Sequence, residues 1–125
     1  MWIMTPNGYY SIVQKPWDRE EDTLTVRARM QEDIESAFYA IPPEERIGEI
    51  EEDQQADYRY RFRAYTVAVS TWMVSNVVDI KYDNFKNEVK KQQGQERADV
   101  YGRIWRELYD MQWSKFWKYD ELELS

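Results

Sequence analysis

Two segments of the chain alternate apolar and polar or basic side chains from one residue to the next. In residues 23–29 (TLTVRAR) the apolar set is Leu24, Val26 and Ala28. In residues 56–65 (ADYRYRFRAY) rings alternate with guanidinium groups. Because successive side chains of a strand point to opposite faces, each segment predicts a β-strand with one apolar and one polar or basic face. The chain is therefore expected to build a sheet that is buried on one side.

The other segments predict a hairpin, one more strand and several helices. Two short apolar runs flank Pro6, Asn7 and Gly8, a turn composition that predicts a β-hairpin. A strand is expected at residues 46–51, and residues 56–65 are expected to form the last and longest strand. Apolar spacing and breakers predict helices at residues 30–39, 66–80, 83–91 and 97–113, with Asp83 as the N-cap of the third.

This order of elements is typical of an α+β protein. It suits an antiparallel sheet with helices packed on one face, and the ferredoxin-like arrangement is one such fold. The length fits a single domain, which we place at residues 1–113, with a polar C-terminal tail at residues 114–125. Residues 66–79 leave two conformations open, because their β-branched side chains favour a strand while their length without Gly or Pro favours a helix.

The residue types that the chain lacks exclude several kinds of site. There is no cysteine and no histidine, which removes disulfides, thiolate chemistry and the Ser-His and Cys-His arrangements. The four glycines form neither a phosphate-binding loop nor a nucleophile elbow. The acidic segment EEDQQAD lacks the spacing and the turn glycine of a calcium loop. We therefore expect a protein that is not an enzyme and that holds no cofactor and no metal.

The hydropathy and charge of the chain predict a cytoplasmic protein. No basic segment followed by an apolar run opens the sequence, and no window approaches about 18 uninterrupted apolar residues. With 24 acidic against 17 basic residues, the formal charge is -7. This charge disfavours contact with anionic membranes and with nucleic acid in general, so any site for an anion must be local.

Several segments together resemble one family of proteins. In order, they are MWIMTPNGYYSIVQKP, DTLTVRAR, ADYRYR, IKYDNFK and YGRIWRELYDMQ. In these segments the chain is similar to a widespread family of small uncharacterised bacterial and phage proteins, over roughly residues 1–112. The resemblance implies a stand-alone cytoplasmic domain with no known cofactor and no catalytic residue to transfer. Residues 66–79 depart from the more charged helix of that family.

The basic side chains of the two alternating segments form the first candidate site. If both strands turn their apolar sides to the helices, five guanidinium groups share the opposite face; they belong to Arg27, Arg29, Arg59, Arg61 and Arg63. The planar fork of arginine suits a phosphate or carboxylate ligand, or the backbone of a nucleic acid. Rings expected nearby, which could stack on bases, are those of Tyr9, Tyr10 and Tyr65. The alternative is an ordinary ionic surface in which Glu49 and Glu51 pair with these arginines.

Acidic segments suggest an alternative function. Residues 18–22 and 44–57 together present a dense negative surface, and such a surface can imitate a phosphate backbone. In that case the chain is an acidic inhibitor or adaptor directed at a protein partner, for example a phage product that blocks a host nucleic-acid-binding or defence protein. Acidic loops more often serve only solubility.

Aromatic residues near the C-terminus form a third candidate. Trp105, Tyr109 and Trp113 are spaced by four residues and share one stripe of a helix. Such stripes mostly fill cores, so Trp105 is expected inside. Trp113, Phe116 and Trp117 lie so near the chain end that a small sheet could leave them uncovered. An uncovered patch of this kind would mark the contact with a protein partner or a homodimer.

Overall fold

The computed structural model describes the backbone of residues 1–124 and the side chains of residues 1–113. The chain forms two compact units, Met1–Lys81 and a second that begins at Tyr82, and each is described by itself. The single domain expected at residues 1–113 stays a prediction. No helix in the described part of the chain combines the length and the apolar character that a membrane span needs.

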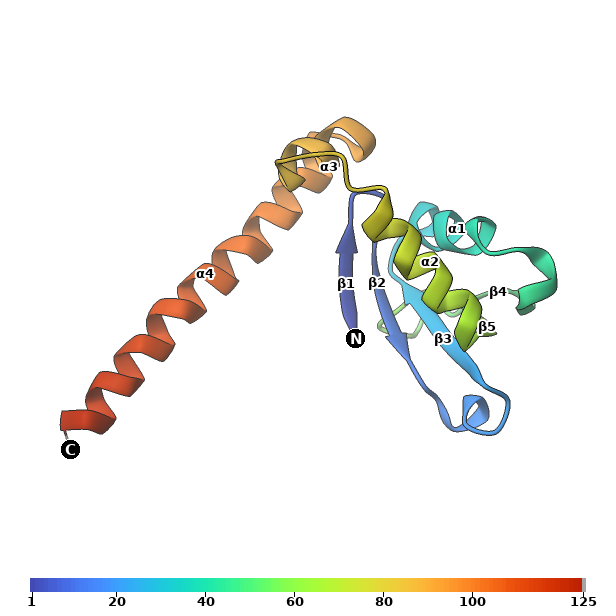
Figure 1. Cartoon of the computed structure of the whole chain (residues 1–125), viewed down its shortest axis with the longest axis horizontal. Helices are drawn as coiled ribbons and strands as arrows, with labels where there is room; N and C mark the ends of the chain where they lie inside the picture. Colours follow the sequence, from blue (N-terminus) through green and yellow to red (C-terminus); the bar gives the residue numbers. More distant parts are fainter. Residues whose placement is uncertain (125) are drawn as a thin grey trace. The chain divides into compact units, whose positions relative to one another are not determined.

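The first unit is a five-stranded sheet with two helices on one face (Figure 1). The strands are β1 (Trp2–Thr5), β2 (Gly8–Val13), β3 (Thr23–Ala28), β4 (Arg46–Glu52) and β5 (Tyr60–Tyr65). Their order in the sheet is β1-β2-β3-β5-β4, and every neighbouring pair is antiparallel. The helices are α1 (Gln31–Ala40), which follows β3, and α2 (Thr66–Val78), which follows β5. The predicted α+β class with an antiparallel sheet is confirmed.

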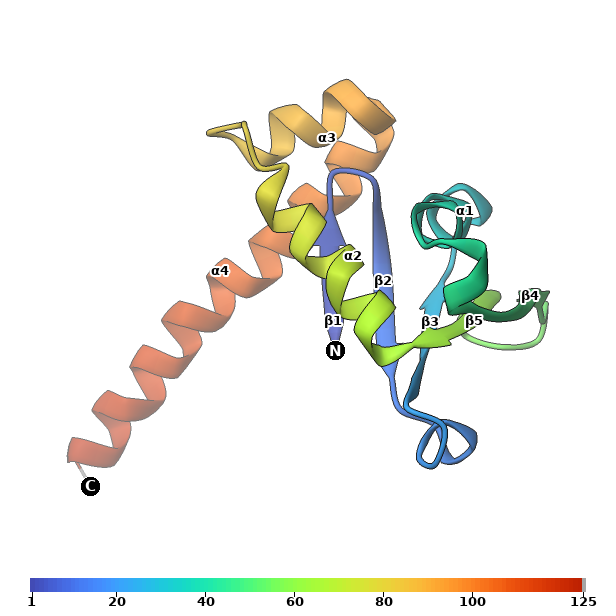
Figure 2. The ribbon, with the colours of Figure 1, turned by 45° about the vertical axis from the view of Figure 1, so that its right-hand side comes forward.

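The connections of this unit follow part of the ferredoxin-like pattern. The chain passes from β3 through α1 to β4, and β5 then lies between β3 and β4 in the sheet (Figure 2). This is a split βαβ unit, the repeated element of that fold. The other neighbour of β3 is β2, which precedes it in the chain. A strand from the N-terminal hairpin thus occupies the position that a final strand takes in the ferredoxin-like order.

The core lies between the sheet and the two helices. The alternating apolar side chains of β3 and β5, such as Val26 and Phe62, are buried there as the sequence predicts. Aromatic rings join the layers edge to face: Tyr10 contacts Trp72 of α2 with centroids 4.9 Å apart, and Phe38 of α1 contacts Phe62 at 5.3 Å. Such pairs add to the stabilisation that comes from burial alone.

Residues 66–78 form a helix, which decides between the two conformations that their composition leaves open. Ala68, Val69 and Trp72 share the buried side of α2 at helical spacing. On the exposed side, the hydroxyl of Thr71 donates to the carbonyl of Val67 at 3.0 Å. The hydroxyl is thus satisfied within the helix, where β-branched residues are tolerated when neighbouring packing supports them.

The boundaries of two other elements differ from the prediction. β5 begins at Tyr60 and has six residues, whereas β4 has seven, so the segment starting at residue 56 is not the longest strand. The third helix, α3 (Phe85–Gln93), is capped by Asn84, whose side chain accepts a bond from the Asn87 amide at 2.9 Å. Asn and Asp are equally good caps, so composition could not choose between adjacent positions.

The second unit consists of two helices, α3 and α4 (Gln95–Leu124), joined at Gly94. The Gly94 φ of 97° is a conformation that side chains rarely adopt. The rings of Phe85 and Tyr101 stack with centroids 5.8 Å apart. Val89 of α3 is fully buried. The backbone of α4 is helical through Leu124, including most of the segment expected to be a polar tail.

Candidate functional site

The sheet face opposite to α1 and α2, called here the outer face, carries a continuous row across all five strands. Strand pairing aligns Trp2 with Ser11, Ser11 with Arg27, Arg27 with Arg61, and Arg61 with Glu51. Side chains of directly paired residues lie about 4.5–5.5 Å apart at Cβ. The register therefore places the guanidinium-bearing residues Arg27 and Arg61 side by side.

Tyr58 joins these arginines, contrary to the alternation of the sequence. The pattern predicts its ring on the apolar side with Tyr60 and Phe62, but Tyr58 lies in the loop before β5. The ring is 3% exposed and contacts the guanidinium groups of Arg27 and Arg29 at 4.5 and 4.4 Å. The backbone carbonyl of Tyr58 accepts a hydrogen bond from Arg61 Nη2 at 3.1 Å. One tyrosine thus holds three arginines together, here called the arginine cluster (Arg27, Arg29 and Arg61).

The Tyr58 hydroxyl reflects this environment. Burial acts to raise its pKa, but the polar groups of Tyr9, Arg29 and Ser11 near the hydroxyl and the charge of Arg29 act in the opposite direction and prevail. The pKa of Tyr58 therefore lies below its ordinary value. The direction of the shift shows that the surroundings of the ring favour negative charge.

The arginine cluster has no acidic partner in the described part of the chain. The ion pairs found there involve other arginines. Neither Glu49 nor Glu51 forms an ion pair with the cluster, although Glu51 lies opposite Arg61 in the strand register. Arg27 donates from Nη2 to the Ser11 hydroxyl at 2.8 Å. The Nε atoms of Arg27 and Arg61 are buried and have no hydrogen-bond partner. Like charges that face each other across a strand pair are destabilising, so the cluster has unused capacity for an anion.

The other two arginines of the candidate site are engaged within the protein. Arg59 pairs with Glu52 at 2.7 Å, and both side chains are roughly half exposed. Arg63 pairs with Asp18 at 3.0 Å and with Glu21 at 2.8 Å. The structure thus separates the five predicted residues into an unpaired cluster of three and two that serve internal contacts.

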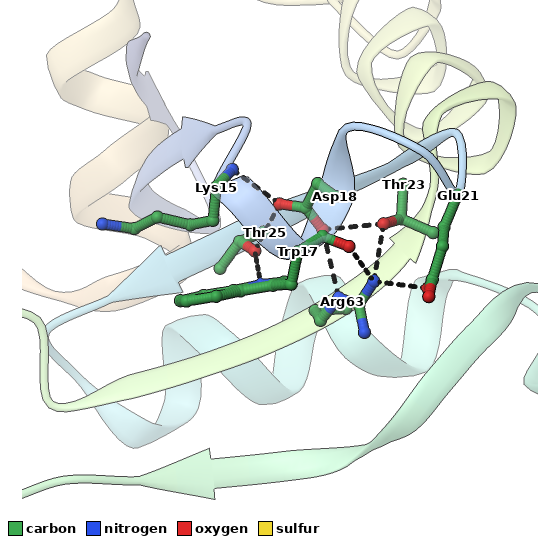
Figure 3. A network of polar contacts seen from close by, with 7 residues as sticks. All are labelled: Lys15, Trp17, Asp18, Glu21, Thr23, Thr25 and Arg63. Atoms are coloured by element: carbon green, nitrogen blue, oxygen red, sulfur yellow. Dashed lines mark hydrogen bonds and ion pairs between the residues drawn. The ribbon is translucent and has the colours of Figure 1, made fainter.

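Asp18 is the centre of a buried polar network (Figure 3). Its carboxylate accepts four hydrogen bonds, from the Lys15 amide at 2.8 Å, Thr23 Oγ1 at 2.7 Å, Thr25 Oγ1 at 2.8 Å and Arg63 Nε at 3.0 Å. Residues 18–22 were expected to present a negative surface, and this expectation is wrong at Asp18, which is fully buried. The short 3₁₀ turn Pro16–Asp18 directs the carboxylate inward. The threonines that alternate with the apolar residues of β3 are the sequence signal that could have indicated a buried acceptor.

The same network removes two carboxylates from the acidic surface that was predicted for residues 18–22. Asp18 is fully buried and Glu21 binds Arg63, so neither side chain is free to imitate a phosphate backbone. Within the described residues, no group of three acidic side chains is arranged to hold a metal ion. Asp18 and Glu21 therefore serve the fold.

We expect the Asp18 network to weaken at low pH. Burial alone would raise the pKa of Asp18, but the bonds from Thr23, the Lys15 amide, Thr25 and Arg63 outweigh burial and lower it. A lowered pKa stabilises the folded state above the unfolded value of about 3.9. This stabilisation is lost as the pH falls through the folded value. Urea unfolding between about pH 5 and pH 2 should therefore bring wild type and Asp18→Asn closer together in stability; a gap that is constant or widens would contradict the assignment.

The remaining predicted residues lie away from the arginine cluster. Tyr65 is 44% exposed at the end of β5, four residues from Arg61, which corresponds to roughly 13 Å along a strand. Trp105 was expected inside but is 56% exposed, and its ring stacks on that of Tyr109 at 5.3 Å. Trp113 is also half exposed. The predictions for Phe116 and Trp117 lie outside the described side chains.

Comparison of the chain with family models, with curated proteins and with solved structures gives no match. The resemblance to a bacterial and phage family stays a prediction.

Proposed function

We propose that this chain is a binding protein whose outer sheet face receives an anionic group of its partner at Arg27, Arg29 and Arg61. The observation that carries the proposal is the direct pairing of Arg27 with Arg61 while neither has an acidic partner in the described chain. An anion between the two groups would offset their repulsion and accept their hydrogen bonds. Guanidinium groups stay protonated, so the cluster is suited to hold charge and not to transfer protons.

The chain's overall acidity fits a local site of this kind. A formal charge of -7 keeps anions away from most of the surface. The second row of the outer face, in which Thr25 pairs with Arg63, is occupied by the Asp18 network. In the described residues, the row with Arg27 and Arg61 contains no ion pair, although Glu51 lies opposite Arg61 at its end.

A simple anion tests the proposal. Calorimetric titration with inorganic tripolyphosphate should show saturable binding at about 50 mM salt that weakens at about 200 mM, because exposed charges are screened. Arg61→Gln should weaken binding about tenfold, the effect of losing one hydrogen-bonded charge. Arg59→Gln is the matched control. Arg59 lies two residues from Arg61 and carries the same charge, but it is already paired with Glu52.

Two results would contradict the proposal. The first is no binding of tripolyphosphate at low salt by the folded wild-type protein. The second is an equal loss of affinity in Arg61→Gln and Arg59→Gln, which would mean that total charge and not the cluster decides binding. Far-UV circular dichroism of each variant checks that the sheet is intact.

A further inference from the structure

The row that contains the arginine cluster reaches an exposed indole at the edge of the sheet. Trp2 of β1 is 74% exposed and is in register with Ser11, which is in register with Arg27. With adjacent strands about 4.8 Å apart, the backbones of Trp2 and Arg27 lie roughly 10 Å apart, and those of Trp2 and Arg61 roughly 14 Å. An aromatic ring and two cations therefore stand along one line across the outer face.

The side chain of Arg27 extends toward Trp2, so its guanidinium group lies closer to β1 than the Arg27 backbone does. Its Nη2 donates to Ser11 Oγ at 2.8 Å, so the guanidinium group reaches the strand beside that of Trp2. Ring contacts in the described residues involve other side chains and leave the indole of Trp2 uncovered. At the opposite end of the row, Glu51 follows Arg61 and would repel a phosphate. The favourable part of the row thus runs from Arg61 to Trp2.

We infer that the anionic ligand of this face is single-stranded nucleic acid, with phosphates at Arg27 and Arg61 and a base stacked on Trp2. The inference rests on the proposed anion site and adds the class of ligand. Proteins that bind single strands combine cations that follow the backbone with exposed rings on which bases stack. A bare phosphate would leave the indole without a role, and a duplex keeps its bases inside the stack. Few cations take part, so affinity is modest and its salt dependence small.

The experiment compares three probes on the whole chain. They are a fluorescently labelled strand of about 12 deoxythymidines, an abasic strand of the same length, and inorganic tripolyphosphate. Fluorescence anisotropy should show that the thymidine strand binds about tenfold more tightly than the abasic strand, because one stacked base contributes that factor. With two phosphates held, the slope of log affinity against log salt should be about -1.4.

Variants of the exposed indoles identify the stacking ring. Trp2→Ala should remove the tenfold preference for the thymidine strand, and Trp2→Phe should keep most of it. Trp105→Ala is the matched control, since Trp105 is an exposed indole of the second unit. Trp2 is mostly exposed on an edge strand, so its replacement should leave the fold intact.

The outcomes separate this inference from the proposed function. Equal binding of the thymidine and abasic strands, unchanged in Trp2→Ala but weakened in Arg61→Gln, overturns the base contact and keeps the anion site. A duplex of the same length is a further probe, and binding of this duplex as tight as that of the single strand also overturns the inference. If none of the three probes binds, both the inference and the proposed function fail.

Discussion

Asp18→Asn is expected to lower the free energy of unfolding by about 3 kcal/mol, the lower end of the range for removing one partner of a buried ion pair. The Asp18 carboxylate accepts from four donors, namely a backbone amide, two threonine hydroxyls and Arg63. An asparagine of the same shape offers one acceptor oxygen and directs an NH₂ group at the other donors. Donors that stay buried without an acceptor destabilise the folded state. Urea unfolding at neutral pH measures the difference.

Glu21→Gln is the control for this prediction. It removes the same charge from the same guanidinium group, because Glu21 also binds Arg63, but its side chain is 60% exposed. Exposed ion pairs contribute little, so a loss of under about 1 kcal/mol is expected. An equal loss of stability in both variants would contradict the prediction that the burial of Asp18 makes its hydrogen bonds more stabilising than the exposed pair of Glu21.

Local patterns of the sequence predict most of the elements and most of the side chains on the two faces of the sheet. The alternation at residues 23–29 identifies β3 and assigns Val26 to the core, as observed. Helical spacing predicts one apolar face with Val69, Trp72, Met73, Val77 and Ile80. Val69 and Trp72 are buried on α2 as predicted, whereas Val77 and Ile80 are exposed. The predictions that succeed do so because the side-chain period of a strand or helix is fixed by backbone geometry alone.

Contacts between distant residues could not be predicted in the same way. Arg63 meets Asp18 across 45 positions of the chain, and their contact depends on the pairing of β3 with β5. The row from Trp2 to Glu51 likewise depends on four strand registers. A register shift of one residue moves every side chain to the other face. The short turn between β1 and β2 limits the register of that pair, but the longer connections between the other strands do not fix theirs. The prediction that the Tyr58 ring lies on the apolar face is wrong for a related reason. Side chains alternate between faces only within a strand, and β5 begins at Tyr60.

The N-terminal hairpin leaves no room for a side chain at Gly8. Thr5 Oγ1 accepts the amides of Asn7 and Gly8, both at 3.1 Å, which closes the turn. The carboxylate of Asp33, from α1, accepts the next amide, that of Tyr9, at 3.0 Å. Helix α1 thus binds the hairpin through a buried carboxylate beside Gly8.

Gly8→Ala is therefore expected to destabilise the protein by about 3 kcal/mol, at the upper end of the usual range for overpacking. An added Cβ would lie 2.6 Å from Tyr10 Oη and 2.9 Å from Asp33 Cγ, and Tyr10 and Asp33 are almost wholly buried. Moving Asp33 would also weaken its bond to the Tyr9 amide. Gly102→Ala, in α4, is the control with the opposite sign, since its Cβ would meet only the flexible end of Lys86 at 3.4 Å and Ala is the better helix former by about 1 kcal/mol. Urea unfolding of both variants tests the difference, and a Gly8→Ala protein as stable as wild type would show that α1 can move away from the hairpin without loss.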